Sequence, residues 1–179
     1  IGQSLDTDKL TLSLSLLRRI GTALRQGGWQ VTAIVALEDS IADGQERAGT
    51  LIDLKPGHMA DNEPMWGLSI DIGTTTVSVW LVDLISGQVK AQTAEYNRQI
   101  GRGDDVISRV IFAGKNNGQN ELRDLVLTSI NTLINRACDK VTSKENATVA
   151  GNGSKARNCA PVEIVKATIA GNSIMMHLL

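Results

Sequence analysis

Aromatic side chains and cysteines are both scarce in this sequence of 179 residues. Only 3% of the residues are aromatic, so any core must be built mainly from Leu, Ile, Val and Ala. The two cysteines, Cys138 and Cys159, form no C-x-x-C motif. Because an iron–sulfur cluster or a structural zinc site needs about four such ligands, the chain cannot hold either one on its own cysteines.

Excess charge and long apolar runs are also missing. The formal net charge is -1, with both signs mixed along the chain, so no field would attract nucleic acid or an anionic membrane. No apolar run approaches the roughly 20 residues that span a bilayer, and the N-terminus lacks the blocks of a signal peptide. We therefore expect a cytoplasmic protein that binds neither nucleic acid nor membrane.

The overall proportion of hydrophobic and charged residues is typical of a globular protein. With 42% hydrophobic and 21% charged residues, the chain has enough apolar surface to bury a core. Domains cluster near roughly 100 to 150 residues, so there is room for one small domain and part of a second. The sequence begins at Ile1 and stops at Leu179 inside an apolar run, and we expect that both ends are cut.

Residues 1–54 predict a small α/β domain. Alternating leucines from Leu10 to Leu16 predict a short strand that runs into a helix, which ends at two glycines. Residues 31–37 and 49–54 are apolar and follow turn signals, so both are predicted strands. Residues 55–64 hold two prolines and no apolar periodicity, which predicts a linker.

Residues 65–179 predict a second sheet with helices packed on it. Three strands form a meander at its start: 66–72, 76–83 and 88–96. The later elements are a helix from a cap at Asp104 to about Ala113, a helix over 121–138, a strand over 163–170 and a final helix. Residues 142–161 are polar and rich in Asn, Gly, Lys and Ser, which predicts an inserted surface loop.

One turn between predicted strands can carry chemistry, and its sequence is Asp71-Ile-Gly73-Thr74-Thr75-Thr76. An acid at the end of a buried strand needs a cation or hydrogen-bond donors, so Asp71 needs a partner. Gly73 lets the backbone turn sharply and approach a ligand, and the three threonines offer amides and hydroxyls to phosphate oxygens. A carboxylate beside such a turn suits a magnesium ion that is held through water.

This pattern resembles the first phosphate loop of the family that joins actin, sugar kinases, acetate kinase and the heat-shock chaperone ATPases. Three further stretches resemble one branch, the reductive activators of corrinoid enzymes. They are residues 29–35, Asn97 with residues 103–110, and residues 169–177. The resemblance implies a small α/β middle domain, then the first lobe of an actin-like (ribonuclease H-like) ATPase domain.

The resemblance assigns site roles residue by residue. It implies that Asp71 is catalytic and positions magnesium. It also implies that Gly73, Thr74 and Thr75 bind the ATP phosphates, with Thr76 as a further donor. Gly171 and Asn172 would lie at a strand end that faces the nucleotide.

A role in the site stays open for three other charged residues, Asp104, Asp105 and Arg109, although a simpler explanation exists. A capping acid and a solvent-facing ion pair at i,i+4 spacing explain Asp105 and Arg109.

The resemblance also implies partners. These are ATP with magnesium and a corrinoid protein, while a two-iron two-sulfur cluster is expected only in a ferredoxin domain that this chain lacks. The complete protein would be an ATPase, and the fragment alone would be inactive. The oligomeric state is open, with a homodimer as one option. Two rivals stay open as well: a small-molecule kinase of the same superfamily, and an actin-like nucleotide-binding scaffold.

We predict that the chain as given binds Mg-ATP poorly and does not hydrolyse it. In a two-lobed fold the nucleotide lies between the lobes, so one lobe offers only phosphate contacts, while the lost freedom of the ligand still costs several kcal/mol. Calorimetric titration should give a Kd of roughly 1 mM at best. A micromolar Kd would mean that the adenosine pocket lies within this chain.

Overall fold

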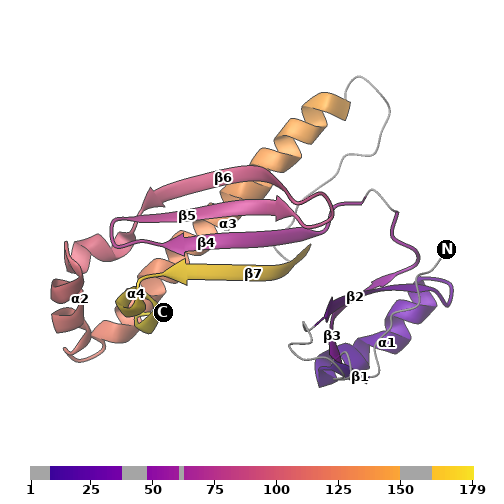
Figure 1. Ribbon diagram of the computed structural model, residues 1–179, viewed down its shortest axis with the longest axis horizontal. Coiled ribbons are helices and arrows are strands. Elements are labelled where there is room, and N and C mark those ends of the chain that lie inside the picture. Colours follow the sequence, from indigo (N-terminus) through magenta and orange to yellow (C-terminus); the bar gives the residue numbers. More distant parts are fainter. Residues whose placement is uncertain (1–8, 38–47, 61–62, 150–162) are drawn as a thin grey trace, which may run out of the picture. The chain divides into compact units, whose positions relative to one another are not determined.

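A computed structural model describes residues 9–37, 48–60, 63–149 and 163–179 (Figure 1). The chain divides into two compact units, Ile1–Glu63 and Pro64–Leu179. Each unit contains a sheet with at least one helix against it. The α/β class predicted from the sequence is therefore confirmed. The units are described separately below as the N-terminal and the C-terminal unit.

The N-terminal unit is a three-stranded sheet with one helix. Its elements are β1 (Lys9–Leu12), α1 (Leu14–Gln26), β2 (Val31–Leu37) and β3 (Ala48–Pro56). The strand order is β1-β3-β2, with β1 parallel and β2 antiparallel to the central β3. Leucines and an alanine of α1 and β3 form a small core, which consists of Leu16, Ala23, Leu51 and Leu54.

Two boundaries in this unit differ from the prediction. The first strand ends at Leu12 and not near Leu16, because Ser13 caps α1 by accepting a hydrogen bond from the Leu16 N–H (3.3 Å). The third strand continues to Pro56 and so includes the start of the predicted linker. The second strand has the predicted bounds, 31–37.

The C-terminal unit is built on a four-stranded sheet. Its strands are β4 (Trp66–Ile72), β5 (Thr76–Asp83), β6 (Gln88–Tyr96) and β7 (Ile164–Gly171). The strand order is β6-β5-β4-β7. Neighbours in the β4-β5-β6 meander are antiparallel, whereas β7 lies parallel to β4. All three strands of the meander have the predicted bounds, and the predicted strand near the end of the chain is present as β7.

All helices of this unit lie between β6 and β7 in the sequence except the last, which follows β7. They are the 3-10 helix η1 (Arg98–Arg102), α2 (Val106–Ala113), α3 (Gly118–Val149) and α4 (Ser173–His177). The cap of α2 is Asp105 and not Asp104, because the Asp105 carboxylate accepts from the Ser108 N–H (2.7 Å).

The loop predicted over residues 142–161 is wrong in its first part, since α3 continues to Val149. This polar stretch contains neither glycine nor proline, so nothing in it ends a helix that is already formed. The rest of the predicted loop lies outside the described residues.

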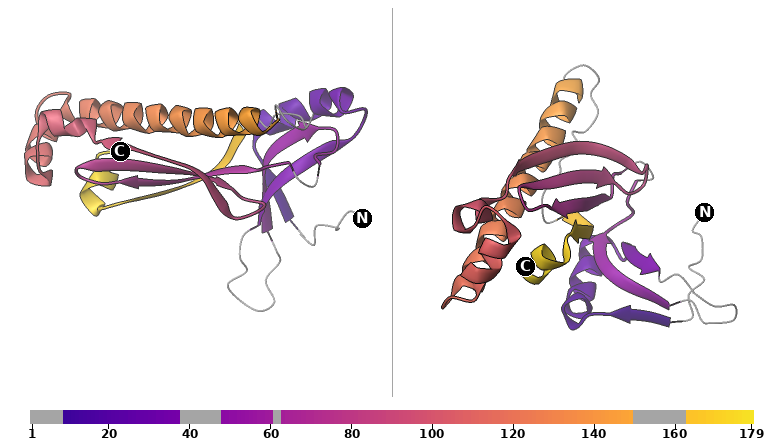
Figure 2. Two further views of the ribbon diagram at one scale, coloured as in Figure 1. Left: turned by 90° about the horizontal axis from the view of Figure 1, so that it is seen from above. Right: turned by 60° about the vertical axis from the view of Figure 1, so that its left-hand side comes forward.

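One face of the four-stranded sheet packs against α3. The helix contacts β5 and β6 and runs along the sheet (Figure 2). Alternate residues of β4 and β5 point into this core, and matching residues of α3 fill it from the other side; the fully covered members include Val77, Val79, Leu81, Leu122, Val126 and Leu133. The intervening β4 residues Ser69 and Asp71 are exposed on the opposite face.

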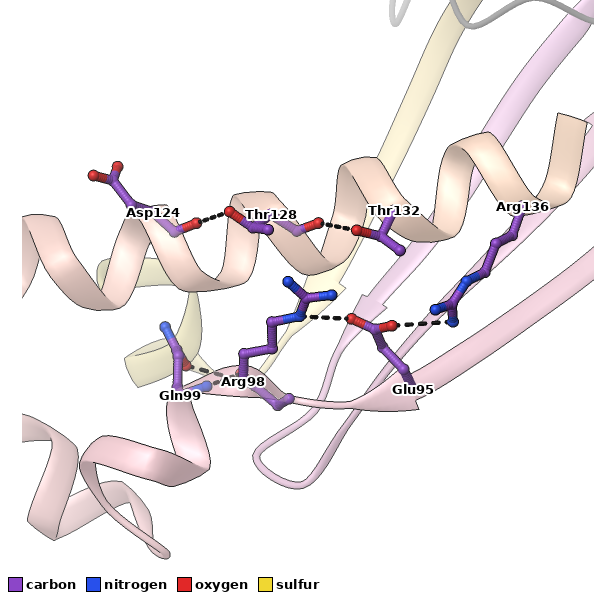
Figure 3. A network of polar contacts seen from close by, with 8 residues as sticks. Glu95, Arg98, Gln99, Asp124, Thr128, Thr132 and Arg136 are labelled. Carbon is purple, nitrogen blue, oxygen red and sulfur yellow. Dashed lines mark hydrogen bonds and ion pairs between the residues drawn. The ribbon is translucent and has the colours of Figure 1, made fainter.

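A charged contact fixes the end of β6 to the helices. Glu95 accepts hydrogen bonds from Arg98 Nε (3.2 Å) and from Arg136 Nη1 of α3 (3.1 Å), as Figure 3 shows. Both arginine side chains are about half exposed, so these ion pairs contribute little to stability. Their effect is to orient the chain where it leaves the sheet.

Truncation of a core leucine of α3 should unfold the C-terminal unit more readily than truncation of a surface leucine. Leu133 is fully buried, whereas Leu127 is 39% exposed on the same helix. We expect Leu133→Ala to lower the free energy of unfolding by about 2–5 kcal/mol and Leu127→Ala by less than about 1 kcal/mol. Urea unfolding followed by circular dichroism measures both. Equal losses would contradict this packing of α3.

Candidate functional site

The turn between β4 and β5 is a tight hairpin. The Gly73 N–H donates to the Thr76 carbonyl (2.9 Å), so the loop of the hairpin consists of Thr74 and Thr75. A Cβ at Gly73 would lie 2.6 Å from the Thr76 carbonyl oxygen, which explains why glycine is needed. Within the part of the chain that the structure describes, the N–H groups of Thr74 and Thr75 donate no hydrogen bond. The turn therefore offers two unused donors.

Asp71 lies just before this hairpin, and its side chain is exposed. It pairs in register with Ser78 on β5 and with Ala170 on β7, on the face opposite α3. The expectation that Asp71 is a buried acid in need of a partner is wrong. Alternation along β4 turns Ile70 and Ile72 into the core and leaves Asp71 exposed to water, so it needs no partner within the chain.

Asn97 holds the hairpin from the end of β6. Its side chain is fully buried, and its Nδ2 donates to the Gly73 carbonyl (2.9 Å). Its backbone N–H donates to the Thr75 carbonyl (2.8 Å), and its Oδ1 accepts from the Gln99 N–H (3.0 Å). Two of the turn's carbonyl groups are thereby fixed by one residue.

Arg109 of α2 is a second anchor, and it is completely buried. Its Nη2 donates to the Thr74 carbonyl (2.6 Å), and its Nε donates to the Gly103 carbonyl (3.0 Å). Its Nη1 lies 3.3 Å from Gln99 Oε1 and 3.3 Å from Met175 Sδ of α4. One side chain thus connects the hairpin, the loop before α2, η1 and α4.

The solvent-facing ion pair expected between Asp105 and Arg109 is absent from the described residues. Asp105 is exposed, and hydrogen bonds from the backbone N–H and the hydroxyl of Ser108 lower its pKa. Arg109 points inward instead, and burial lowers its pKa without removing the charge of the guanidinium. Sequence reasoning missed this residue because i,i+4 spacing to an acid is equally compatible with a surface pair.

Gln99 joins these anchors to the core helix. It is 1% exposed, and its Nε2 donates to the Leu122 carbonyl in α3 (2.9 Å). Its Oε1 accepts from both Asn97 Nδ2 (3.3 Å) and Arg109 Nη1 (3.3 Å). The hairpin is therefore connected to the packed face of the sheet through buried hydrogen bonds, which makes its shape dependent on the core.

Gly171 and Asn172 come to the same place from the far end of the chain. In the parallel β4–β7 pair, Gly171 lies opposite Ile72, and a Cβ on it would be 3.0 Å from the Ile72 carbonyl oxygen. Asn172 caps α4 by accepting from the Met175 N–H (2.9 Å), and its Nδ2 lies 3.3 Å from Thr74 Oγ1. The structure thus brings the two predicted segments together.

Metal-binding side chains form no cluster in the described ranges. No group of three or more His, Cys, Asp or Glu side chains there could hold a metal ion. Cys138 is buried in α3, and Cys159 lies outside the described residues. None of the described helices combines the length and the apolar character that crossing a membrane requires.

An α/β chain with a buried polar network behind a glycine-threonine hairpin is compatible with several families, and comparison with known proteins identifies one. Residues 66–179 match the family model of the RACo middle region, and residues 1–61 match that of the RACo linker region. The chain belongs to the RACo family. The family names thus differ from the prediction. The predicted small middle domain lies in the linker region of the family, and the hairpin lies in its middle region.

Two relatives agree with this assignment and confirm the resemblance seen in the sequence. The corrinoid activation enzyme RamQ of Eubacterium limosum is 29% identical over 129 residues, which cover 72% of this chain and 19% of RamQ. The second is a solved structure, the reductive activator for corrinoid, iron-sulfur protein, which is 36% identical in sequence and has a TM-score of 0.68. The match covers 94% of this chain and 23% of the chain of that protein. The chain thus spans about a fifth of each relative.

Alanine at Gly73 should strain the hairpin. The added methyl group would meet the Thr76 carbonyl oxygen, so we expect Gly73→Ala to lower the free energy of unfolding by about 1–3 kcal/mol. Gly101→Ala is the matched control, because nothing lies within 4 Å of a Cβ there. Chemical denaturation of both variants compares them. A Gly73→Ala variant as stable as the control would show that the turn is not tightly closed.

Proposed function

We propose that this chain is part of an ATP-dependent reductive activator of a corrinoid protein. Within that activator, this part binds the nucleotide phosphates. The two relatives are named as a corrinoid activation enzyme and as a reductive activator for a corrinoid, iron-sulfur protein. Membership of the family supports the same role for the whole protein to which this sequence corresponds. ATP, magnesium and the corrinoid protein are the proposed partners, and the cytoplasm is the proposed location.

The observation that carries the proposal is the pair of unused N–H groups at Thr74 and Thr75, which follow the exposed Asp71 closely in the chain. Backbone N–H groups of a turn are suitable donors for phosphate oxygens, because they converge without a side chain between them. Gly73 keeps one side of the turn free of bulk. Asn97 and Arg109 bind the carbonyl groups of the same turn, which leaves its donors for a ligand.

Sheet topology supports the location of the site. Parallel strands end at the same edge of a sheet, and ligands of α/β proteins bind preferentially outside the carboxyl ends of such strands. Here the carboxyl end of β4 leads into the hairpin, and that of β7 leads into Asn172 and α4. An antiparallel meander followed by helices and a parallel strand is compatible with the actin-like first lobe that the resemblance implies.

The residues present fit magnesium and ATP. Magnesium is commonly held in proteins by one or two carboxylates together with substrate phosphates, and Asp71 is an exposed carboxylate next to the phosphate donors. Asp71 would orient the ion through water, and Thr74, Thr75 and Thr76 would bind phosphate oxygens. Bound magnesium would offset phosphate charge and favour hydrolysis.

Nucleotide hydrolysis would supply free energy and no electrons. A reduced two-iron two-sulfur cluster in another domain would supply the electrons, and nucleotide-dependent movement of two lobes would make their uphill transfer to the corrinoid possible. The residues of this chain would sense the nucleotide through the hairpin. Their contacts with η1, α3 and α4 offer a physical route by which that state reaches the rest of the lobe.

Replacement of Asp71 by asparagine should abolish most ATP hydrolysis in the full-length protein while the fold is kept. The side chain is exposed, so the change removes no core contact, but it removes the charge that positions magnesium. We expect a fall in kcat of about 100-fold or more. Steady-state phosphate release and circular dichroism are the two measurements.

Asp124→Asn is the matched control, since Asp124 is an exposed carboxylate of α3 with a 69% exposed side chain. It makes the same change of charge far from the hairpin in sequence and should leave kcat unchanged. Equal turnover by wild type and a folded Asp71→Asn variant would reject the role of Asp71.

A further inference from the structure

Arg109 is a buried cation that forms no ion pair with the described residues, and the acids that act on its charge, Asp104 and Asp105, are both exposed. It is 0% exposed, yet none of the ion pairs formed by the described residues includes it. Its hydrogen-bond partners are two backbone carbonyl groups, an amide oxygen and a thioether sulfur. All four acceptors are neutral, so they satisfy its N–H groups, and only the exposed carboxylates of Asp104 and Asp105 offset its charge from a distance.

Burial of such a charge opposes folding. A buried ion is retained at low cost only where it is paired, and a well-packed apolar side chain in its place often costs nothing. A full positive charge behind a turn is therefore poorly explained by stability alone. The charge is explained if an anion binds on the other side of that turn, because the low dielectric of the interior strengthens attraction across it.

The shortest contact of Arg109 points to where that anion binds. Nη2 donates to the Thr74 carbonyl at 2.6 Å, and the unused N–H groups of the hairpin belong to Thr74 and Thr75. A guanidinium that binds a peptide carbonyl polarises the peptide group, which strengthens the donor at its other end. Here that donor is the Thr75 N–H, one of the two proposed phosphate ligands.

We infer that Arg109 is a positioning residue for phosphate binding, which holds the Gly73–Thr76 hairpin in its binding shape and supplies the positive charge behind it. The inference rests on the proposed function, since it deepens the role of the same hairpin. Arg109 does not touch the ligand. It acts through the Thr74–Thr75 peptide group and through the field of its buried charge.

The same side chain ties the hairpin to α4. Met175 Sδ accepts from Nη1 (3.3 Å), and Met175 is 1% exposed. Asn172, which caps α4, reaches Thr74 Oγ1 independently (3.3 Å). Arg109 and Asn172 therefore both connect Thr74 with α4, so loss of Arg109 should loosen the hairpin and α4 together.

Three variants of the full-length protein distinguish the effect of the Arg109 charge from that of its hydrogen-bond geometry, and one of them is a control. Arg109→Met keeps an unbranched apolar stem but removes the charge and all donors. Arg109→Lys keeps the charge but cannot form the forked contacts to several acceptors at once. Arg136→Met is the control, since it removes one positive charge from a 54% exposed side chain on α3 that binds Glu95 and not the hairpin.

Binding is measured by calorimetric titration with Mg-ATP and by competition with adenosine, at a temperature where every variant is folded. We expect Arg109→Met to bind Mg-ATP at least about tenfold more weakly, which corresponds to about 1.4 kcal/mol, and to bind adenosine as wild type does. Arg109→Lys should lie between the two, and Arg136→Met should match wild type. Hydrogen exchange without nucleotide should become faster in the hairpin and α4 but not in residues 126–137 of α3.

Each other outcome counts against the inference. Wild-type affinity for Mg-ATP in Arg109→Met would overturn it and leave the proposed function intact. Equal losses for Mg-ATP and adenosine, with faster exchange throughout the unit, would reveal a merely structural arginine. If Arg109→Met does not fold, Arg109→Lys decides by the same criteria. Failure of the wild-type protein to bind Mg-ATP would reject the proposed function and this inference with it.

Discussion

A single hydrogen bond, from the guanidinium of the buried Arg109 to the Thr74 carbonyl, constrains the rest of the site. Arg109 joins two short segments that are far apart in the sequence, the hairpin with its two-residue loop and α4 with five residues. Because a buried guanidinium has few alternative acceptors, its position and the shape of the hairpin depend on each other. Asn97 and Gln99 extend this dependence to the carbonyl groups of Gly73, Thr75 and α3.

Stability and chemistry are divided between the two faces of the C-terminal sheet. The face against α3 is filled by aliphatic side chains such as Ile70 and Ile72, and this burial supplies the driving force for folding. The opposite face carries Asp71, whose charge costs nothing in water. An exposed carboxylate is thus available near the end of a strand whose other residues, apart from Ser69, are buried. A strand covered on both faces could not offer one without a second ion.

Much of this arrangement could be predicted because it follows from local patterns. Alternating apolar residues defined β4, β5 and β6 with the observed bounds, and the hairpin was recognised from Gly73 and its neighbouring threonines. The direction of Arg109 could not be predicted, because Asp105 at i−4 satisfies a local rule that tertiary packing overrides. The same limit applies to α3, whose polar continuation to Val149 lacks the periodic signal that marks its earlier turns.

The hairpin pattern alone is weak grounds for a binding site, since a glycine-threonine turn after an acid also occurs in ordinary meanders. What distinguishes this one is a second segment far along the chain. Parallel pairing places Gly171 opposite Ile72, and the absence of a Cβ at Gly171 lets the chain pass close to the Ile72 carbonyl. Asn172 can then cap α4 and reach Thr74 with the same side chain. The β4–β7 pairing brings the two segments together, and a ligand held by the hairpin and by Asn172 would use this arrangement.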